Sequence, residues 1–247
     1  MEILNKCIGC WQCIPYCPVG AIKKNETERV SYINHDECVE CGVCINSGIC
    51  PVQAIYQNEL AWPDFLKAKW SSVVYIHPET NIQGRGTDEM KTNDVTGRFK
   101  PGFIGVGVEL GRPSTGTRFE DVEKVTKALA ECDVTFEKNN PLTSFINTNT
   151  GLFQEEWQGY PLNEKFRKTK VMTVIIEAII KDYKMLEIIE RLKTVSKEIN
   201  TVMSVELITK CNENGEIPIT QILSENEIKY YINGKTNIGL GKPKYIF

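Results

Sequence analysis

The residues with the clearest chemistry are cysteines gathered near the amino-terminal end. Eight of the ten cysteines lie within residues 7–50 and form two runs of similar spacing. The first run is Cys7-x-x-Cys10-x-x-Cys13-x-x-x-Cys17-Pro18, and the second is Cys38-x-x-Cys41-x-x-Cys44-x-x-x-x-x-Cys50-Pro51. Three cysteines at two-residue intervals can turn their thiolates toward one iron–sulfur group. The spacing therefore predicts two [4Fe-4S] clusters.

The cysteine before proline in each run lies too far along the chain to close the site of its own run, and it then binds the other cluster. We therefore expect two crossed ligand sets. They are Cys7, Cys10, Cys13 and Cys50 for the first cluster, and Cys38, Cys41, Cys44 and Cys17 for the second. The second run is longer by two residues, within residues 45–49. We expect a local bulge there, with ligation by Cys50 retained.

A disulfide framework or zinc sites could also use clustered cysteines. Disulfides belong to secreted proteins, and residues 1–6 contain no apolar stretch of secretory length. Structural zinc sites usually show two separated cysteine pairs, whereas each run here has three evenly spaced cysteines before its Cys-Pro. Zinc, or a single remaining cluster, stays the minor alternative. Reduced cysteines predict a cytoplasmic protein.

Residues 1 to about 58 resemble a bacterial-type ferredoxin with two [4Fe-4S] clusters. The two halves echo one another, because Cys17-Pro-Val-Gly-Ala-Ile22 returns as Cys50-Pro-Val-Gln-Ala-Ile55. The resemblance implies low-potential electron transfer, as a carrier or as an electron-transfer subunit of an anaerobic redox system. Because thiolate-bound clusters add negative charge, we expect a redox partner protein with a basic docking face.

Length and composition indicate that further domains follow the cysteine-rich part. The chain has 247 residues, of which 41% are hydrophobic and 25% charged, as in globular proteins. The formal charge of -3 gives no general attraction to nucleic acid. The most apolar stretch, residues 171–180, is too short for membrane insertion and contains Glu177. The sequence leaves the oligomeric state open.

The pattern of apolar residues predicts an α+β protein. We expect a ferredoxin domain at residues 1–58, a linker at 59–70, an α/β domain at 71–165 and a second α/β sandwich unit at 166–247. The predicted strands are 71–77, 103–110, 134–136, 171–180 and 201–209, and the predicted helices are 118–131, 185–199 and 219–228. Cys132 continues the apolar face of the first helix, which predicts that it is buried.

The two α/β units share a pattern at an offset of 67 residues. This offset superposes the apolar helix positions Phe119 and Leu186, Val122 and Ile189, Val125 and Leu192, and Ala128 and Val195. An internal duplication and chance similarity between two common motifs both explain it. In either case we expect helices that cover one face of an antiparallel or mixed sheet.

Glycines and arginines alternate in the long connection between residues 80 and 118. Arg85, Arg98 and Arg112 are candidates for binding an anionic substrate or a flavin phosphate through paired hydrogen bonds. Residues 84–98 resemble a segment of ferredoxin-bearing hydroxynicotinate-type reductases. The alternative is that these arginines and Arg118 pair with nearby acids such as Glu109, or dock the acidic surface of the ferredoxin domain. No dinucleotide or phosphate-loop fingerprint is present.

Three functions remain open at this point. The first is electron transfer through the two clusters, and the second is a reductase that binds an anion or flavin in the glycine- and arginine-rich loop. The third is a redox-sensing regulatory or assembly protein. The chain has two histidines, His35 and His77, and neither lies in a pattern typical of hydrolytic catalysis.

Overall fold

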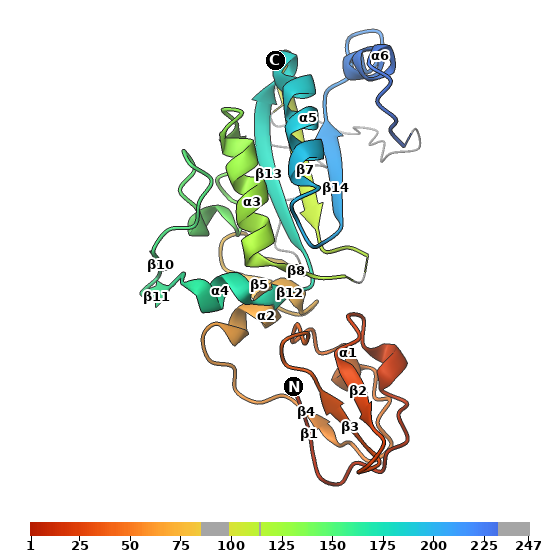
Figure 1. The fold of residues 1–247 in the computed structure, drawn as a ribbon. Helices are drawn as coiled ribbons and strands as arrows, with labels where there is room; N and C mark the ends of the chain where they lie inside the picture. Colours follow the sequence, from red (N-terminus) through yellow and green to blue (C-terminus); the bar gives the residue numbers. More distant parts are fainter. Residues whose placement is uncertain (85–98, 114, 232–247) are drawn as a thin grey trace.

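The amino-terminal residues form a small unit of short strands around the eight cysteines (Figure 1). The structure is a computed structural model that describes residues 1–84, 99–113 and 115–231. In the small unit β1 (Glu2–Ile3) pairs with β4 (Ile55–Tyr56), and β2 (Ile22–Asn25) pairs with β3 (Val30–Ile33), both antiparallel. A short helical turn accompanies each cysteine run, η1 (Ile14–Tyr16) and α1 (Val43–Asn46).

The core of the small unit combines a few apolar side chains with cysteines. Its buried cluster combines Met1, Ala21, Ile22 and Ile33 with three cysteines, Cys13, Cys38 and Cys44. So few apolar side chains bury too little surface to stabilise a domain of this size by themselves. We therefore expect the two predicted clusters to contribute to the folding of this unit.

An exposed connection at residues 57–61 leads from β4 to α2 (Asp64–Ser71). Most of the predicted linker at 59–70 is therefore helical, and α2 buries Leu66 and Trp70 in the core of the larger unit. The predicted strand at 71–77 is wrong except for β5 (Ile76–His77), which pairs with β6 (Ile82–Gln83). The helix continues to Ser71, and Val73 and Val74 are 66% and 64% exposed, so an extended segment there would bury no face.

The larger unit is built on one antiparallel sheet with the strand order β14-β7-β13-β9. Its helices α3 and α5 cover one face of this sheet (Figure 1). The chain runs strand-helix-strand two times, as β7-α3-β9 and then β13-α5-β14. This order is the split β-α-β arrangement. The elements are β7 (Phe103–Leu110), α3 (Phe119–Ala130), β9 (Thr135–Phe136), β13 (Val174–Lys181), α5 (Met185–Val195) and β14 (Met203–Ile208).

The α+β class is confirmed, and the strands of both predicted α/β ranges join one sheet. The apolar residues of β7 that alternate toward the helices are almost completely buried, namely Ile104, Val106, Val108 and Leu110. Cys132 is buried in the same core, as its helix position predicts. The predicted strand at 171–180 is interrupted at residues 172–173, between β12 (Lys170–Val171) and β13.

The duplication stays a prediction, but the burial of the two helices shifts its register. On α5 the buried residues are Met185, Ile188, Leu192 and Val195, whereas Leu186 and Ile189 are only partly buried. Phe119 of α3 thus corresponds in burial to Met185, and Val122 to Ile188, an offset of 66 residues. The offset of 67 aligns residues of similar type, but two of the α5 residues that it aligns, Leu186 and Ile189, lie at the edge of the helix face that is buried.

The remaining elements close the ends of the larger unit. An aromatic cluster at one end stacks Phe119 on Phe166 and Phe145 on Trp157, with ring centroids 4.4 and 4.3 Å apart. No described helix is long and apolar enough to span a bilayer. The other elements are β8 (Thr117–Arg118), η2 (Thr143–Phe145), β10 (Glu156–Trp157), β11 (Tyr160–Pro161), α4 (Glu164–Lys168), η3 (Asp182–Lys184) and α6 (Pro218–Glu225).

Candidate iron–sulfur centres

A first cavity in the small unit is lined by four cysteines, which are Cys7, Cys10, Cys13 and Cys50. The loop that carries the first three turns at Gly9, whose φ is +63°. A Cβ atom at this position would lie 2.0 Å from the carbonyl oxygen of Arg29, so a side chain has no room there. Gly9 therefore lets the loop pack directly on the turn between β2 and β3.

A second cavity is lined by the other four cysteines, which are Cys17, Cys38, Cys41 and Cys44. Its walls are apolar and include Ala21, Ile22, Ile33 and Val39. The two cavities are equal in volume, about 320 Å³ each when the space open to solvent is included, so they can accept groups of the same size. The structure thus brings together the same two crossed sets that the spacing predicts.

The longer loop before Cys50 does not disturb the turn that follows it. The backbone N–H of Ala54 donates to Cys50 Sγ at 3.2 Å, and the N–H of Ala21 donates to Cys17 Sγ at 3.1 Å. The two extra residues are taken up before Cys50, where α1 ends and Gly48 adopts a φ of +63°. Each Cys-Pro-Val-x-Ala turn therefore supplies one amide hydrogen bond to a sulfur atom.

The two cavities differ in the polar groups beside their cysteines. Near the first, the backbone N–H of Ser31 lies 3.5 Å from Cys7 Sγ, and its hydroxyl oxygen lies 3.5 Å from Cys13 Sγ. Near the second, Cys38 Sγ lies 3.5 Å from a carboxylate oxygen of Glu40. The Glu40 carboxylate accepts two 2.7 Å hydrogen bonds from the buried amino group of Met1. A neutral hydroxyl thus stands in one site where a buried ion pair stands in the other.

Burial makes the cysteines of the second cavity reluctant to ionise. It raises the pKa of the Cys38 thiol to about 12 and that of Cys44 to about 11, and it also raises the pKa of Cys41. These thiols are protonated at neutral pH unless a metal group displaces the protons, because a metal binds the thiolate. Assembly of a metal group at this site must therefore release protons.

The donor set and its arrangement fit iron–sulfur clusters. Thiolates are the ligands that such clusters use, and four of them surround each cavity instead of converging on one point. Among the residues that the structure describes, no group of three or more His, Cys, Asp or Glu side chains is arranged to hold a single metal ion. The geometry therefore favours a polynuclear group over a zinc ion, which needs four ligands about 2.0 to 2.3 Å from one centre.

Of the three arginine candidates the structure describes only Arg112, and Arg112 lines neither cavity. Arg112 is 54% exposed and donates to Glu109 Oε1 at 3.4 Å, which is the acid pairing considered as the alternative to anion binding. Arg85 and Arg98 lie outside the described residues. The anion or flavin site in the glycine- and arginine-rich loop therefore stays a prediction.

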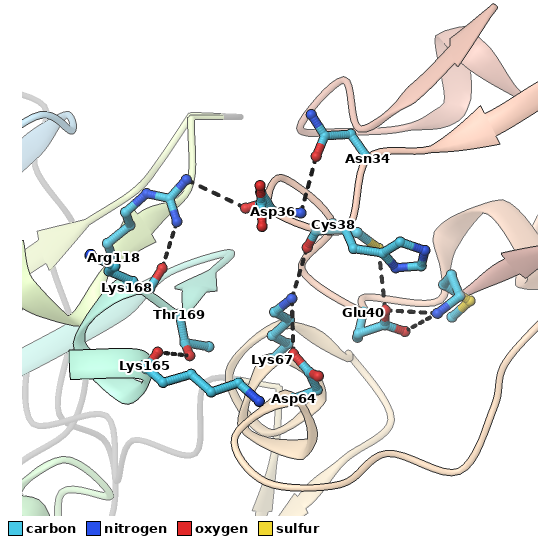
Figure 2. Close-up of polar contacts among 12 residues, drawn as sticks. Asn34, Asp36, Cys38, Glu40, Asp64, Lys67, Arg118, Lys165, Lys168 and Thr169 are labelled. Atoms are coloured by element: carbon cyan, nitrogen blue, oxygen red, sulfur yellow. Dashed lines mark hydrogen bonds and ion pairs between the residues drawn. The ribbon is translucent and has the colours of Figure 1, made fainter. Parts of the chain in front are cut away.

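Arg118 contacts the small amino-terminal unit. This contact agrees with the alternative that these arginines bind the acidic surface of the ferredoxin domain. It donates to the carbonyl oxygens of Lys168 and Asp36 and lies 3.1 Å from Glu37 Oε1 (Figure 2 shows the two carbonyl contacts). Sequence reasoning missed that Glu37 takes part, together with Lys67 and Lys170 of the larger unit. A signal was available, since acids are concentrated at residues 36–40 and bases at 165–170.

Sequence reasoning also missed a buried polar cluster on α2 and the hairpin after it. Lys69 pairs with Glu79, and its ammonium lies 5.0 Å from the ring centre of Trp157. Burial lowers the pKa of Lys69 and of the completely buried His77. His77 Nε2 lies 2.9 Å from the carbonyl oxygen of Gly84. None of these residues lines either cysteine cavity.

Comparison with known proteins agrees with this geometry. The model of the 4Fe-4S dicluster domain family matches residues 6–54. A 7Fe ferredoxin of Hydrogenibacillus schlegelii is 36% identical over 74 residues, which are 29% of this chain and 83% of the relative. The chain covers 48% to 58% of several other curated ferredoxins. No solved structure matches the chain.

Two further relatives are subunits of larger complexes. Subunit PorD of the pyruvate synthase of Methanocaldococcus jannaschii is 42% identical over 51 residues, 21% of this chain and 56% of the subunit. One subunit of an ion-translocating oxidoreductase complex of Methanosarcina acetivorans is 45% identical over 49 residues, 20% of this chain and 17% of the relative. Both matches are confined to a segment of about ferredoxin length.

The chain belongs to the ferredoxin family through its 4Fe-4S dicluster domain. This domain carries two [4Fe-4S] clusters and supports iron–sulfur electron transfer.

Proposed function

We propose that this chain passes single low-potential electrons, as a carrier or as an electron-transfer subunit of an anaerobic redox system in the cytoplasm. The observation that carries the proposal is the presence of two separate cavities, each lined by four cysteines drawn from both runs. When bound, the two clusters supply reversible one-electron storage. The names of the two complex subunits among the relatives support the subunit role.

In this proposal the cysteines hold the clusters in crossed sets. Cys7, Cys10, Cys13 and Cys50 bind the first, and Cys38, Cys41, Cys44 and Cys17 bind the second. The amides of Ala21 and Ala54 donate to one cysteine sulfur in each set, which stabilises the more negative state of the site. The apolar walls keep water away from the sulfur atoms and favour the less charged state. The balance of these two effects sets each potential.

The first site is the more open of the two. Cys10 is exposed and Ile8 beside it is 61% exposed, whereas Cys38 and Cys44 are buried. A separate redox partner could therefore approach closest at the first site. A basic docking face on that partner is expected from the charge of the clusters and from the solvent-accessible acids Glu2 and Asp36 of the small unit.

Anaerobic purification with iron and sulfide determination tests the proposal. Two [4Fe-4S] clusters require about eight iron atoms and about eight acid-labile sulfides per chain. We expect these contents, together with reduction by one electron per cluster in a potentiometric titration followed by EPR. Iron-free protein that contains zinc, or iron without acid-labile sulfide, would overturn it.

A further inference from the structure

Basic side chains of the larger unit meet the loop that leads into the second cysteine run (Figure 2). Lys67 of α2 donates to the carbonyl oxygen of His35 at 2.9 Å, and its side chain is 10% exposed. Arg118 of β8 donates to the carbonyl oxygen of Asp36 at 3.4 Å. The larger unit therefore holds two successive carbonyl groups directly before Glu37 and Cys38.

Next to these two carbonyl groups, the carboxylate of Glu37 pairs with two basic side chains of the larger unit. Arg118 lies 3.1 Å from Glu37 Oε1, and Lys170 pairs with Glu37 Oε2. The hydrogen bond from Lys170 lowers the pKa of Glu37. Each oxygen of one carboxylate thus has its own basic partner, and both partners belong to the larger unit.

The two cations face each other directly in the β8–β12 ladder, where Lys170 is the register partner of Arg118. Like charges directly opposite in a sheet destabilise the pair of strands unless an anion is shared between them. Gly116 makes room for this arrangement, because a Cβ atom there would lie 2.7 Å from Lys170 Cε. We call Arg118 and Lys170 the cationic fork, and Glu37 is the anion that it receives.

The fork lies at the second cysteine run and away from the first. Residues 34–37 follow β3 at the open end of the β2–β3 hairpin, whereas the turn at the other end packs against Gly9 of the first run. The hairpin ladder is four residues long, which separates its first and last residue pairs by about 10 Å at about 3.3 to 3.4 Å per residue. A charge on Arg118, Lys170 or Glu37 is therefore closer to the second cysteine cavity than to the first.

The charges of the two units are complementary at this contact. Residues 34–58 contain no lysine or arginine, and two of their acids, Asp36 and Glu37, are not buried. The larger unit of the same chain supplies the complementary basic face, through Lys67, Arg118 and Lys170. We propose that the larger unit is the docking face for the second cluster site, fixed through Glu37, and that the cationic fork sets the reduction potential of that site apart from the first. This inference rests on the proposed function.

Charge variants with potentiometric EPR titration test the electrostatic part. Glu37→Gln removes a negative charge and is expected to shift one of the two midpoint potentials upward, since reduction adds an electron. Lys170→Met removes a positive charge and is expected to shift the same midpoint downward. Glu123→Gln, which alters the Arg167 ion pair within the larger unit, is the matched control and should leave both midpoints unchanged.

Opposite shifts of a single midpoint support the proposal, because a purely structural role would not reverse sign between Glu37→Gln and Lys170→Met. Equal shifts of both midpoints, or no shift with either variant, would overturn it. Iron and sulfide contents are measured on the same samples. Loss of clusters from the unmodified chain would count against the proposed function instead.

Small-angle X-ray scattering tests the docking itself without relying on electron transfer. Glu37→Lys places a third cation at the fork and is expected to separate the units, which increases the radius of gyration. Adding Lys170→Glu to Glu37→Lys is expected to restore most of the compact form. Docking that is unaffected by Glu37→Lys would contradict the role given to Glu37.

Discussion

At the scale of single residues, the two cavities of the ferredoxin domain are each lined by four cysteines but differ in the polar groups beside them. The amide bonds to Cys17 and Cys50 are alike in length, whereas Ser31 stands beside one site and Glu40 beside the other. The repeated turn is local, so it follows the repeated sequence. The differing neighbours come from other parts of the chain, and they give the two sites different electrostatic surroundings.

The crossed ligand sets make opposite predictions for two similar variants. Cys17→Ser is expected to remove the cluster bound by the second run, because the side chain of Cys17 lines the second cavity. Cys50→Ser is expected to remove the cluster bound by the first run. EPR of the reduced proteins, with iron counts, identifies which signal is lost. Loss of the same signal in both variants would disprove the crossing.

Burial of His77 predicts a loss of stability in mild acid. Desolvation lowers its pKa in the folded chain below the value of about 6.5 in an unfolded one. As the pH falls through 6.5, the unfolded chain binds the proton first, so the free energy of unfolding decreases until the folded pKa is reached. Urea denaturation of His77→Gln should show a weaker pH dependence between about pH 6.5 and 5. Parallel curves for the variant and the parent would contradict this.

At the scale of elements, the larger unit depends on close approaches between loops and helices. The carbonyl oxygen of Gly151 accepts a 2.5 Å hydrogen bond from the hydroxyl of Thr126, which lies in the middle of α3. Gly151 has a φ of +70°, and a Cβ atom there would lie 2.2 Å from the carbonyl oxygen of Thr126. The loop at residues 147–151 can therefore pack on α3 only if it carries glycine at this position.

Gly151→Ala is expected to destabilise the larger unit by about 2 to 4 kcal/mol, from left-handed backbone strain together with overpacking. Gly159→Ala is the matched control, because Gly159 has a φ of +82° but a Cβ atom there would meet no heavy atom within 4 Å. The control should lose only the strain contribution, about 1 to 2 kcal/mol. Urea denaturation measures both, and equal losses would show that the contact with α3 is unimportant.

At the scale of the whole molecule, two units are joined by an exposed connection and by ion pairs at one loop. The side chains of the central contact are partly open to solvent, with 31% of Arg118 and 35% of Glu37 exposed. Such pairs are individually weak, and salt screens them. The docking of the units should therefore respond to ionic strength more than the folding of either unit does.

Raising the salt concentration from about 0.1 M to about 1 M shortens the Debye length from about 10 Å to about 3 Å. We expect faster proteolysis of the connection at residues 57–61 at the higher concentration, since an undocked connection is more accessible. Glu37→Gln should be cut faster at low salt and should respond less to added salt. A parent chain cut at the same rate at both concentrations would argue against ionic docking.

Sequence reasoning predicts most of the larger elements but not their limits or their common sheet. The segments that form β7 and α3 have strong apolar periods, and their predicted ranges agree with the structure to within one residue at each end. The segment 71–77 is rich in β-branched residues, yet α2 occupies its start because Leu66 and Trp70 fill the core. Propensity alone does not reveal which apolar side chains find a core to enter.

Local spacing by itself predicted the two cysteine sets that line the cavities, because the first three cysteines of each run lie within seven residues and the pre-proline cysteine lies too far along to close the same site. The tertiary structure alone decided which surface faces the second site. Glu37 meets Arg118 and Lys170 across 81 and 133 residues of chain, respectively. No short-range pattern encodes such contacts, because they exist only after β8 and β12 have paired and the two units have docked.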